Sequence, residues 1–182
     1  MLDSSEDQVS TACAAAAIAE LIRARAIPVE SCVEQLLQTV QQATSTLAGI
    51  DNSRNTWTEP EQYALTILHY ALSALSSSSS SSSSIRGHIT PATLPVLLDV
   101  LKLRRRHCNV RSQDDAARAS RLAGLKRLDR AQDDALSILE RFACNTAGRQ
   151  DFAAAGTSLL CQTLTKVFSE WGCAVISGPV SS

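Results

Sequence analysis

The residues with the clearest chemical potential in this 182-residue chain are basic, and they gather in one stretch. Residues 104–130 begin with Arg104, Arg105 and Arg106, and then continue with Arg118, Arg121, Lys126, Arg127 and Arg130. The whole chain has a net charge of -1, so this stretch is locally basic in a nearly neutral protein. Guanidinium groups bind carboxylates and phosphates well, which suggests an acidic peptide or RNA as partner. The alternative is a solvated helix surface without a partner, and the lack of interleaved aromatic residues argues against single-stranded nucleic acid.

Other reactive residue types form no recognisable catalytic or metal-binding motif. The chain has no glycine-rich phosphate loop, no GxSxG and no HExxH sequence. His69, His88 and His107 are scattered, and none has a second ligand at metal-binding spacing. We therefore expect no catalytic residue, no cofactor and no bound metal.

The cysteines and the first residues indicate where the protein works. The six cysteines, Cys13, Cys32, Cys108, Cys144, Cys161 and Cys173, include no CxxC pair, and we expect them to be small, reduced, buried side chains. The opening sequence MLDSSEDQV is acidic where a signal or transit peptide is basic. No apolar run is long enough to cross a bilayer, so we expect no membrane association. These features predict a cytoplasmic protein, with the nucleus as an alternative.

The elements that position these residues are predicted to be helices. The chain is 45% hydrophobic but only 4% aromatic, and it is poor in glycine and proline, which favours an all-α fold. Seven segments show helical spacing of apolar residues: about 8–25, from Pro28 to near Gly49, from Thr58 to Leu75, from Pro91 to Leu103, from Ser112 to Leu128, from about Arg130 to Phe142, and from about Thr157 to Trp171.

Each predicted helix has an apolar row that we expect to be buried. The rows are, in order, Ala14, Ala17, Ile18, Leu21 and Ile22; Val29, Cys32, Val33, Leu36, Leu37 and Val40; Ala64, Ile67, Leu68, Ala71, Leu72 and Leu75; Leu94, Leu97, Leu98 and Leu101; Ala116, Ala119, Leu122 and Leu125; Ala135, Ile138, Leu139 and Phe142; and Leu160, Leu164, Val167, Phe168 and Trp171. Thr58 and Glu61 have the spacing of a capping box. The serine run of residues 76–84 is predicted to be a disordered loop, because it has nothing to bury.

The segment Ala135–Leu164 combines these features in a specific order. An apolar helix ends in the small-residue turn Ala143, Cys144 and Asn145; a short helical stretch with Arg149, Gln150 and Phe152 follows; and Gly156 precedes a helix with leucine pairs. This order resembles an armadillo repeat. In that comparison the helix from Thr58 is a preceding third helix and the helix from Pro91 a second helix. The helix 112–128 is then an insertion or an extended third helix, and HEAT-like or unclassified helical repeats are the alternative.

The resemblance implies a right-handed, armadillo-like α-solenoid, whose repeats bury their apolar faces only by stacking on one another. It also implies a partner protein bound on the concave face of the third helices. Peptide-binding members of the family carry asparagine there, whereas this chain has Arg141 at the matching position, and Tyr70 or Ala74 in the earlier helix. An arginine at this place suits a carboxylate-bearing partner.

These interpretations together predict a non-enzymatic scaffold or adaptor for another protein. The expected partner-binding residues are Arg141, Arg104, Arg105, Arg106, Arg121 and Arg127. Two alternatives stay open: an armadillo-type nucleotide-exchange factor of a heat-shock chaperone, and an RNA-associated protein that uses residues 104–130. The predicted organisation is an N-terminal helical region (1–75), a serine-rich loop (76–90), an armadillo-like region (91–172) and a disordered tail (173–182).

Overall fold

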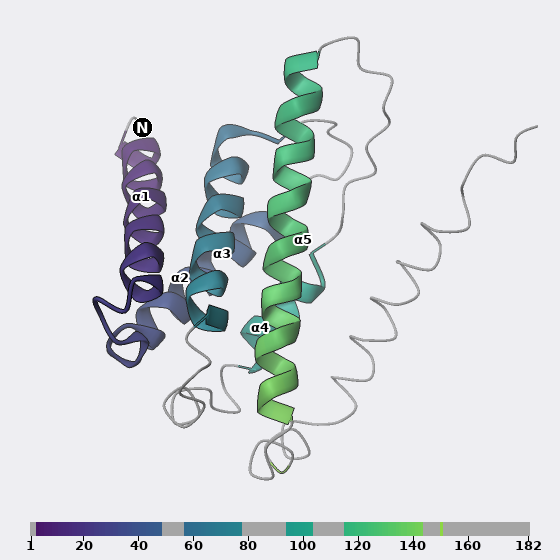
Figure 1. Cartoon of the computed structure of the whole chain (residues 1–182). Helices are drawn as coiled ribbons and strands as arrows, with labels where there is room; N and C mark the ends of the chain where they lie inside the picture. The colour runs from purple at the N-terminus through teal and green to yellow at the C-terminus, as the bar shows by residue number, and fades with distance from the viewer. Residues whose placement is uncertain (1–2, 49–56, 78–93, 104–114, 144–149, 151–182) are drawn as a thin grey trace, which may run out of the picture.

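The computed structural model describes residues 3–48, 57–77, 94–103, 115–143 and 150 (Figure 1). Most of these residues are helical and none of them is in a strand, which confirms the all-α prediction for this part of the chain. The elements are α1 (Asp3–Arg23), the short 3-10 helix η1 (Val29–Ser31), α2 (Val33–Ala48), α3 (Glu59–Ser77), α4 (Leu94–Leu101) and α5 (Asp115–Ala143).

Three long helices lie side by side in one row, in the order α1, α3, α5 (Figure 1). The helices α2 and α4 lie behind this row, where α2 packs on α3, α4 packs on α5, and the two contact each other. The odd-numbered helices α1, α3 and α5 therefore form one layer, and α2 and α4 form the other. The central helix α3 contacts α1, α2 and α5, which makes it the most enclosed of the three row helices.

The three row helices run in the same direction. Trp57, just before α3, donates its indole N–H to the carbonyl of Arg121 in the first part of α5, whereas Ser76 at the end of α3 accepts from Arg141 at the end of α5. The start of α1 likewise shares a cleft with the start of α3 and with the end of α2. Thus α2 returns the chain, and α3 repeats the direction of α1.

The apolar rows predicted for α2, α3, α4 and the second half of α5 are buried as expected. Leu36, Leu68, Leu97 and Ala135 are each at most 2% exposed, and only Cys32 in these rows is half-buried. The predicted capping box at the start of α3 has its carboxylate half in place, because the Thr58 N–H donates to Glu61 Oε2 at 2.8 Å. Spacing alone was thus sufficient for these helices.

The buried face of α1 was predicted wrongly, except at Ile22. The side that packs into the core carries Ala12, Ala15, Ala19 and Ile22, while Ala14 and Ala17 are exposed, Ile18 is half-buried and Leu21 is 44% exposed. The reason is compositional: alanines lie on almost every side of this helix, so their spacing does not single out one face.

The two helices predicted over 112–128 and from Arg130 are one continuous helix, α5. No proline or helix-ending turn separates them, so the backbone hydrogen bonds continue. The predicted apolar row of the first half was also wrong: Ala116 and Ala119 are exposed, Leu122 is 47% exposed and Leu125 is half-buried. The buried side of this half carries Arg121, Gly124 and Leu128 instead.

One close contact explains the glycine inside α5. A Cβ at Gly124 would lie 2.7 Å from Cδ1 of Trp57, and closer still to its Nε1. The indole is buried, and its N–H donates to the Arg121 carbonyl of the α5 backbone at 3.3 Å. Glycine in a helix interior is unfavourable by itself, so its presence here reflects the space that Trp57 occupies.

A buried glutamine joins α5 to the end of α4. Gln132 is 1% exposed, and its Nε2 donates to the carbonyls of Val100, at 3.2 Å, and Leu103, at 3.0 Å. The last carbonyls of a helix have no partner within the helix, and here a side chain from the neighbouring layer supplies the donors. Gln132 therefore fixes the register of α4 on α5.

Several predicted features lie outside the described residues. These are the greater part of the serine run, Arg104, Arg105, Arg106, the turn at Cys144 and Asn145, Gly156 and the helix from Thr157 to Trp171. Of the predicted repeat Ala135–Leu164, the structure thus describes only the helical residues 135–143 and residue 150.

Candidate functional site

Charged side chains gather where α3 and α5 meet on the exposed side of the row. We name this surface the α3–α5 seam and define it by His69 and Ser76 of α3 and by Arg127, Arg130, Asp134 and Arg141 of α5. The α5 members share one side of their helix, because their spacing follows whole helical turns. The α3 members are seven residues apart, which also places them on one side. Both helices thus contribute one stripe to a common surface.

Two hydrogen bonds join α3 and α5 at the C-terminal end of the seam. The Ser76 hydroxyl donates to Asp134 Oδ1 at 2.6 Å, and Arg141 Nη1 donates to the Ser76 carbonyl at 2.6 Å. That carbonyl is among the last of α3, so the guanidinium caps the negative end of the helix. Asp134 is thereby engaged by a hydroxyl, and no ion pair within 4 Å joins it to an arginine of the described helices.

Arg127 and Arg130 lie nearer the N-terminal end of the seam, and neither has a partner among the described residues. Arg127 is half-buried and Arg130 is exposed, and neither guanidinium takes part in a hydrogen bond or ion pair with any described residue. Both lie close enough to His69 to influence its ionisation. No described side chain therefore neutralises either guanidinium through a direct ion pair.

His69 reports the electrostatics of the seam. Burial lowers the pKa of its imidazole below the usual 6.5, because a half-buried ring holds a charge less well than a solvated one. Asp134 opposes this shift, while Arg130, Arg127 and, from the end of α1, Arg23 strengthen it. The arginines therefore create a positive field at His69, and its ring stays neutral at pH 7.

This lowered pKa predicts a loss of stability in mild acid. The unfolded chain binds a proton at His69 near pH 6.5, whereas the folded chain binds it only at lower pH, so the free energy of unfolding should fall as pH drops below about 6.5. Thermal melts of wild type and His69→Gln between pH 7.5 and pH 5, roughly spanning the window expected for histidine, measure this. We expect the variant to lose less stability than wild type over that range; equal losses would contradict it.

Serine, aspartate and histidine meet in the seam, yet they are not arranged as a hydrolytic triad. In such a triad the serine bonds the imidazole, and the imidazole bonds the carboxylate. Here Ser76 donates directly to Asp134, and the buried Nδ1 of His69 has no hydrogen-bond partner. The arrangement supplies neither a base for Ser76 nor an orienting group for His69.

The predicted partner-binding residues are distributed unevenly. Arg127 and Arg141 lie in the seam, while Arg104, Arg105 and Arg106 are outside the described residues. Arg121 is 7% exposed, and its backbone carbonyl accepts from Trp57. We therefore leave Arg121 out of the candidate surface, since a partner has little of it to contact.

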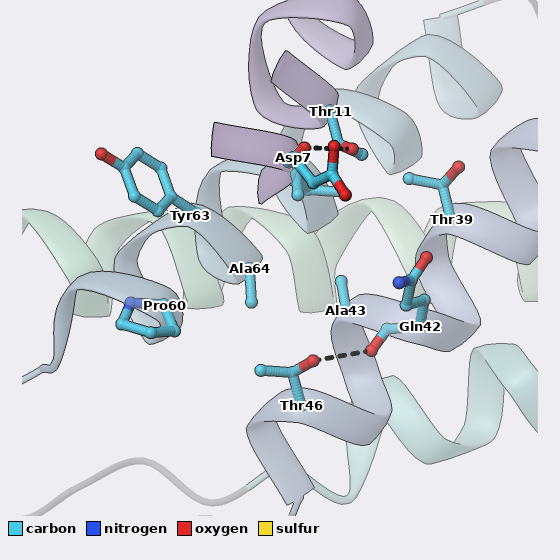
Figure 2. Close-up of a pocket in the computed structure, with 10 residues that line it drawn as sticks. Asp7, Thr11, Thr39, Gln42, Ala43, Thr46, Pro60, Tyr63 and Ala64 are labelled. Atoms are coloured by element: carbon cyan, nitrogen blue, oxygen red, sulfur yellow. Dashed lines mark hydrogen bonds between the residues drawn. The ribbon is translucent and has the colours of Figure 1, made fainter. Parts of the chain in front are cut away.

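A cleft of about 240 Å³ with a mixed polar and apolar lining opens between the starts of α1 and α3 and the end of α2 (Figure 2). Three of its hydroxyls are already used within their own helices: Thr11 donates to the Asp7 carbonyl, Thr39 to the Gln35 carbonyl, and Thr46 to the Gln42 carbonyl. The Tyr63 hydroxyl lies on the far side from Gln42 (Figure 2), where it donates to Glu59 and where this bond raises its pKa. Among the described residues that line the cleft, Asp7 is the only charged one, so we do not choose this cleft as the site.

The described cysteines differ from the prediction that they are buried. Cys13 is exposed, and Cys32 is half-buried with its thiol directed to the Val29 carbonyl at 3.3 Å. Burial raises the pKa of the Cys32 thiol, so it stays protonated at neutral pH. Over the described ranges, no three His, Cys, Asp or Glu side chains gather in a way that could hold a metal ion. No described helix is long and apolar enough to span a bilayer.

Four seam residues were not selected from the sequence as site residues: His69, Ser76, Arg130 and Asp134. Arg130 was recognised only as part of a basic stretch, and His69 only as a scattered histidine. Their proximity depends on α3 and α5 running in the same direction, which no local pattern encodes. The one available signal was spacing, since Arg127, Arg130, Asp134 and Arg141 recur at helical-turn intervals.

Over the residues that the structure describes, the class of this protein is its architecture alone, an all-helical arrangement with a parallel three-helix row. No family model, no curated protein and no solved structure matches the chain.

Proposed function

We propose that this chain is a non-enzymatic interaction scaffold that binds a partner protein on the exposed face of the α1–α3–α5 row, and that its helices form a short armadillo-like α-solenoid. The observation that carries the proposal is the parallel row itself, with α2 and α4 in a second layer. Helix pairs stacked in one direction generate an extended face made of equivalent helices. Such faces bind other proteins.

The exposed apolar side chains support stacking rather than a closed bundle. Among the described residues, the large hydrophobic side chains that remain exposed are Val9 and Leu21 of α1 and Leu122 of α5. These two helices are the ends of the row, whereas α3 in the middle has none. A stacked array has unburied apolar surface at its ends, because each unit buries its faces only against a neighbour.

The order of the elements also supports the armadillo-like proposal. In that assignment α1, α3 and α5 are third helices, α2 and α4 are second helices, and η1 takes the place of a short first helix. The continuous α5 then corresponds to an extended third helix. Tyr70, one of the two residues matched to the family's asparagine, lies opposite the buried Leu68 and Leu72, whereas Ala74 is buried. Tyr70 is half-buried and partly packed on the core, so of the two residues it is the one with surface left for a partner.

The proposal is tested by asking whether a substitution on the exposed face of the row abolishes capture of a partner protein. Tagged wild-type chain, Tyr70→Ala and Gln38→Ala are each used to capture proteins from cells, and the captured proteins are quantified by mass spectrometry. Gln38 is the control, because it is exposed on α2 in the other layer. Aromatic residues often dominate binding energy, so we expect a protein captured by wild type and by Gln38→Ala to be depleted at least about tenfold with Tyr70→Ala.

The other outcomes decide against the proposal. A partner retained equally by all three chains places binding elsewhere. Recovery of RNA that is lost after nuclease treatment, with no protein partner, supports an RNA-associated protein instead. If the partner is a heat-shock chaperone and the purified chain speeds its nucleotide release, the protein is a chaperone regulator rather than a passive scaffold. Circular dichroism melts of the variants confirm that each one is folded.

A further inference from the structure

We infer that the partner segment seated on the α3–α5 seam is acidic, and that its carboxylates are bound by Arg127, Arg130 and Arg141. This inference rests on the proposed function, because it names the chemistry of the segment that the row would bind. The seam is small and specific: three arginines project from one side of α5, and one carboxylate, Asp134, lies among them. A partner is therefore attracted by charge before it is selected by shape.

The first support is that two of the arginines are uncompensated. No ion pair joins Arg127 or Arg130 to the described residues, although Asp134 lies one helical turn from Arg130. Asp134 instead accepts from the Ser76 hydroxyl. An arginine pair on a helix, with the carboxylate on the same side of that helix bound to another donor, suits carboxylates supplied from outside.

The second support is that the positive field extends across the row. His69 on α3 is influenced by Arg127 and Arg130 from α5 and by Arg23 from the end of α1, and all three hold its pKa down. Arg23 is paired with Glu20, so it adds less to the attraction than the seam arginines. Arginines thus lie on both sides of α3, opposed by Asp134 on the α5 side and by Glu20 on the α1 side.

The third support is the geometry of Arg141. One guanidinium nitrogen donates to the Ser76 carbonyl, which fixes the side chain against the end of α3. A guanidinium has five N–H donors, so several stay available for a carboxylate while the first keeps the group in place. A side chain already fixed loses less entropy on binding than a free one. Arg141 thus lies at the C-terminal end of the seam, with its guanidinium already oriented to donate to a carboxylate.

Fluorescence anisotropy with defined probes tests the inference. The full chain is titrated into labelled glutamate-rich peptide, lysine-rich peptide of equal length, and single-stranded RNA of comparable charge to the glutamate peptide. We expect binding of the glutamate peptide that weakens with salt, and no binding of the lysine peptide. Arg127→Glu with Arg130→Glu should weaken the glutamate peptide at least about tenfold. Arg118→Glu is the matched control, because Arg118 is exposed on another side of α5.

Nuclear magnetic resonance of His69 adds a readout at the site. Carboxylates bound beside the ring offset the arginine field, so the glutamate peptide should raise the pKa of His69, and His69→Gln identifies its signal. Tighter binding of RNA than of the glutamate peptide, equal weakening by Arg118→Glu, or an unchanged His69 pKa in the bound state would each overturn the inference. If these tests fail while Tyr70→Ala still loses a captured protein, the proposed function stands and only the acidic chemistry is wrong.

Discussion

Replacing Gln132 by glutamate is expected to lower the free energy of unfolding by about 4 kcal/mol at neutral pH. The wild-type amide donates to the carbonyls of Val100 and Leu103 from a position that is 1% exposed. A carboxylate there has no proton to donate, faces two carbonyl oxygens, and is buried without a compensating charge. Urea unfolding followed by circular dichroism measures the loss.

Two comparisons separate the charge from the lost hydrogen bonds. Gln132→Met keeps the approximate shape and removes both donors, so we expect a smaller loss of about 2 kcal/mol. Burial should raise the pKa of the introduced glutamate, so its protonated form restores one donor and the deficit relative to wild type should shrink in mild acid. Asp133→Asn, at the exposed neighbouring position, should have little effect. A stable Gln132→Glu protein at neutral pH would contradict the packing of α4 on α5.

Replacing Gly124 by alanine is expected to lower the free energy of unfolding by about 2 kcal/mol, even though alanine is the better helix former. The new methyl group would lie 2.7 Å from Trp57 Cδ1, so the indole or the helix has to move. The indole N–H bond to the Arg121 carbonyl would be strained by that movement. Chemical unfolding of both proteins gives the difference directly.

A second background reverses the sign of this effect. In Trp57→Ala the space beside Gly124 is empty, so Gly124→Ala should stabilise the protein by about 1 kcal/mol through helix propensity alone. If Trp57→Ala does not fold, the emission of Trp57 in a Trp171→Phe background gives the answer. It should shift to the red in Gly124→Ala as the indole leaves its buried position. The same effect of Gly124→Ala with and without Trp57 would show that the two residues do not touch.

The sequence predicted those parts of the fold in which apolar spacing is unambiguous. The rows around Leu36, Leu68 and Leu97 alternate with polar residues at helical intervals, so their buried faces followed directly. The face of α1 did not follow, because alanine is present on nearly every side and burial of a methyl group discriminates weakly between faces. Which face of α1 packs was decided by α3, a helix distant in sequence.

The candidate site was less predictable than the helices because it depends on pairs of distant residues. Ser76 and Asp134 are 58 residues apart, and Ser76 and Arg141 are 65 apart. No local rule joins such pairs. A glycine inside an otherwise helical pattern, such as Gly124, was the one local sign that another element approaches the backbone closely. The burial of Arg121, close to Gly124 on α5, was missed because it depends on packing against residues that are distant in sequence.

Site-specific photo-crosslinking tests most directly the claim that the exposed face of the row binds a protein. Tyr70 is replaced in the full chain by benzoylphenylalanine, which is similar in shape, and Gln38 of α2 is replaced in the control. After irradiation in cells, we predict one discrete protein adduct through position 70 and none through position 38. Introducing Arg127→Glu and Arg130→Glu should weaken the adduct through position 70. An adduct only at position 38, or none at either position while the partner is still captured, would contradict the assignment of this face.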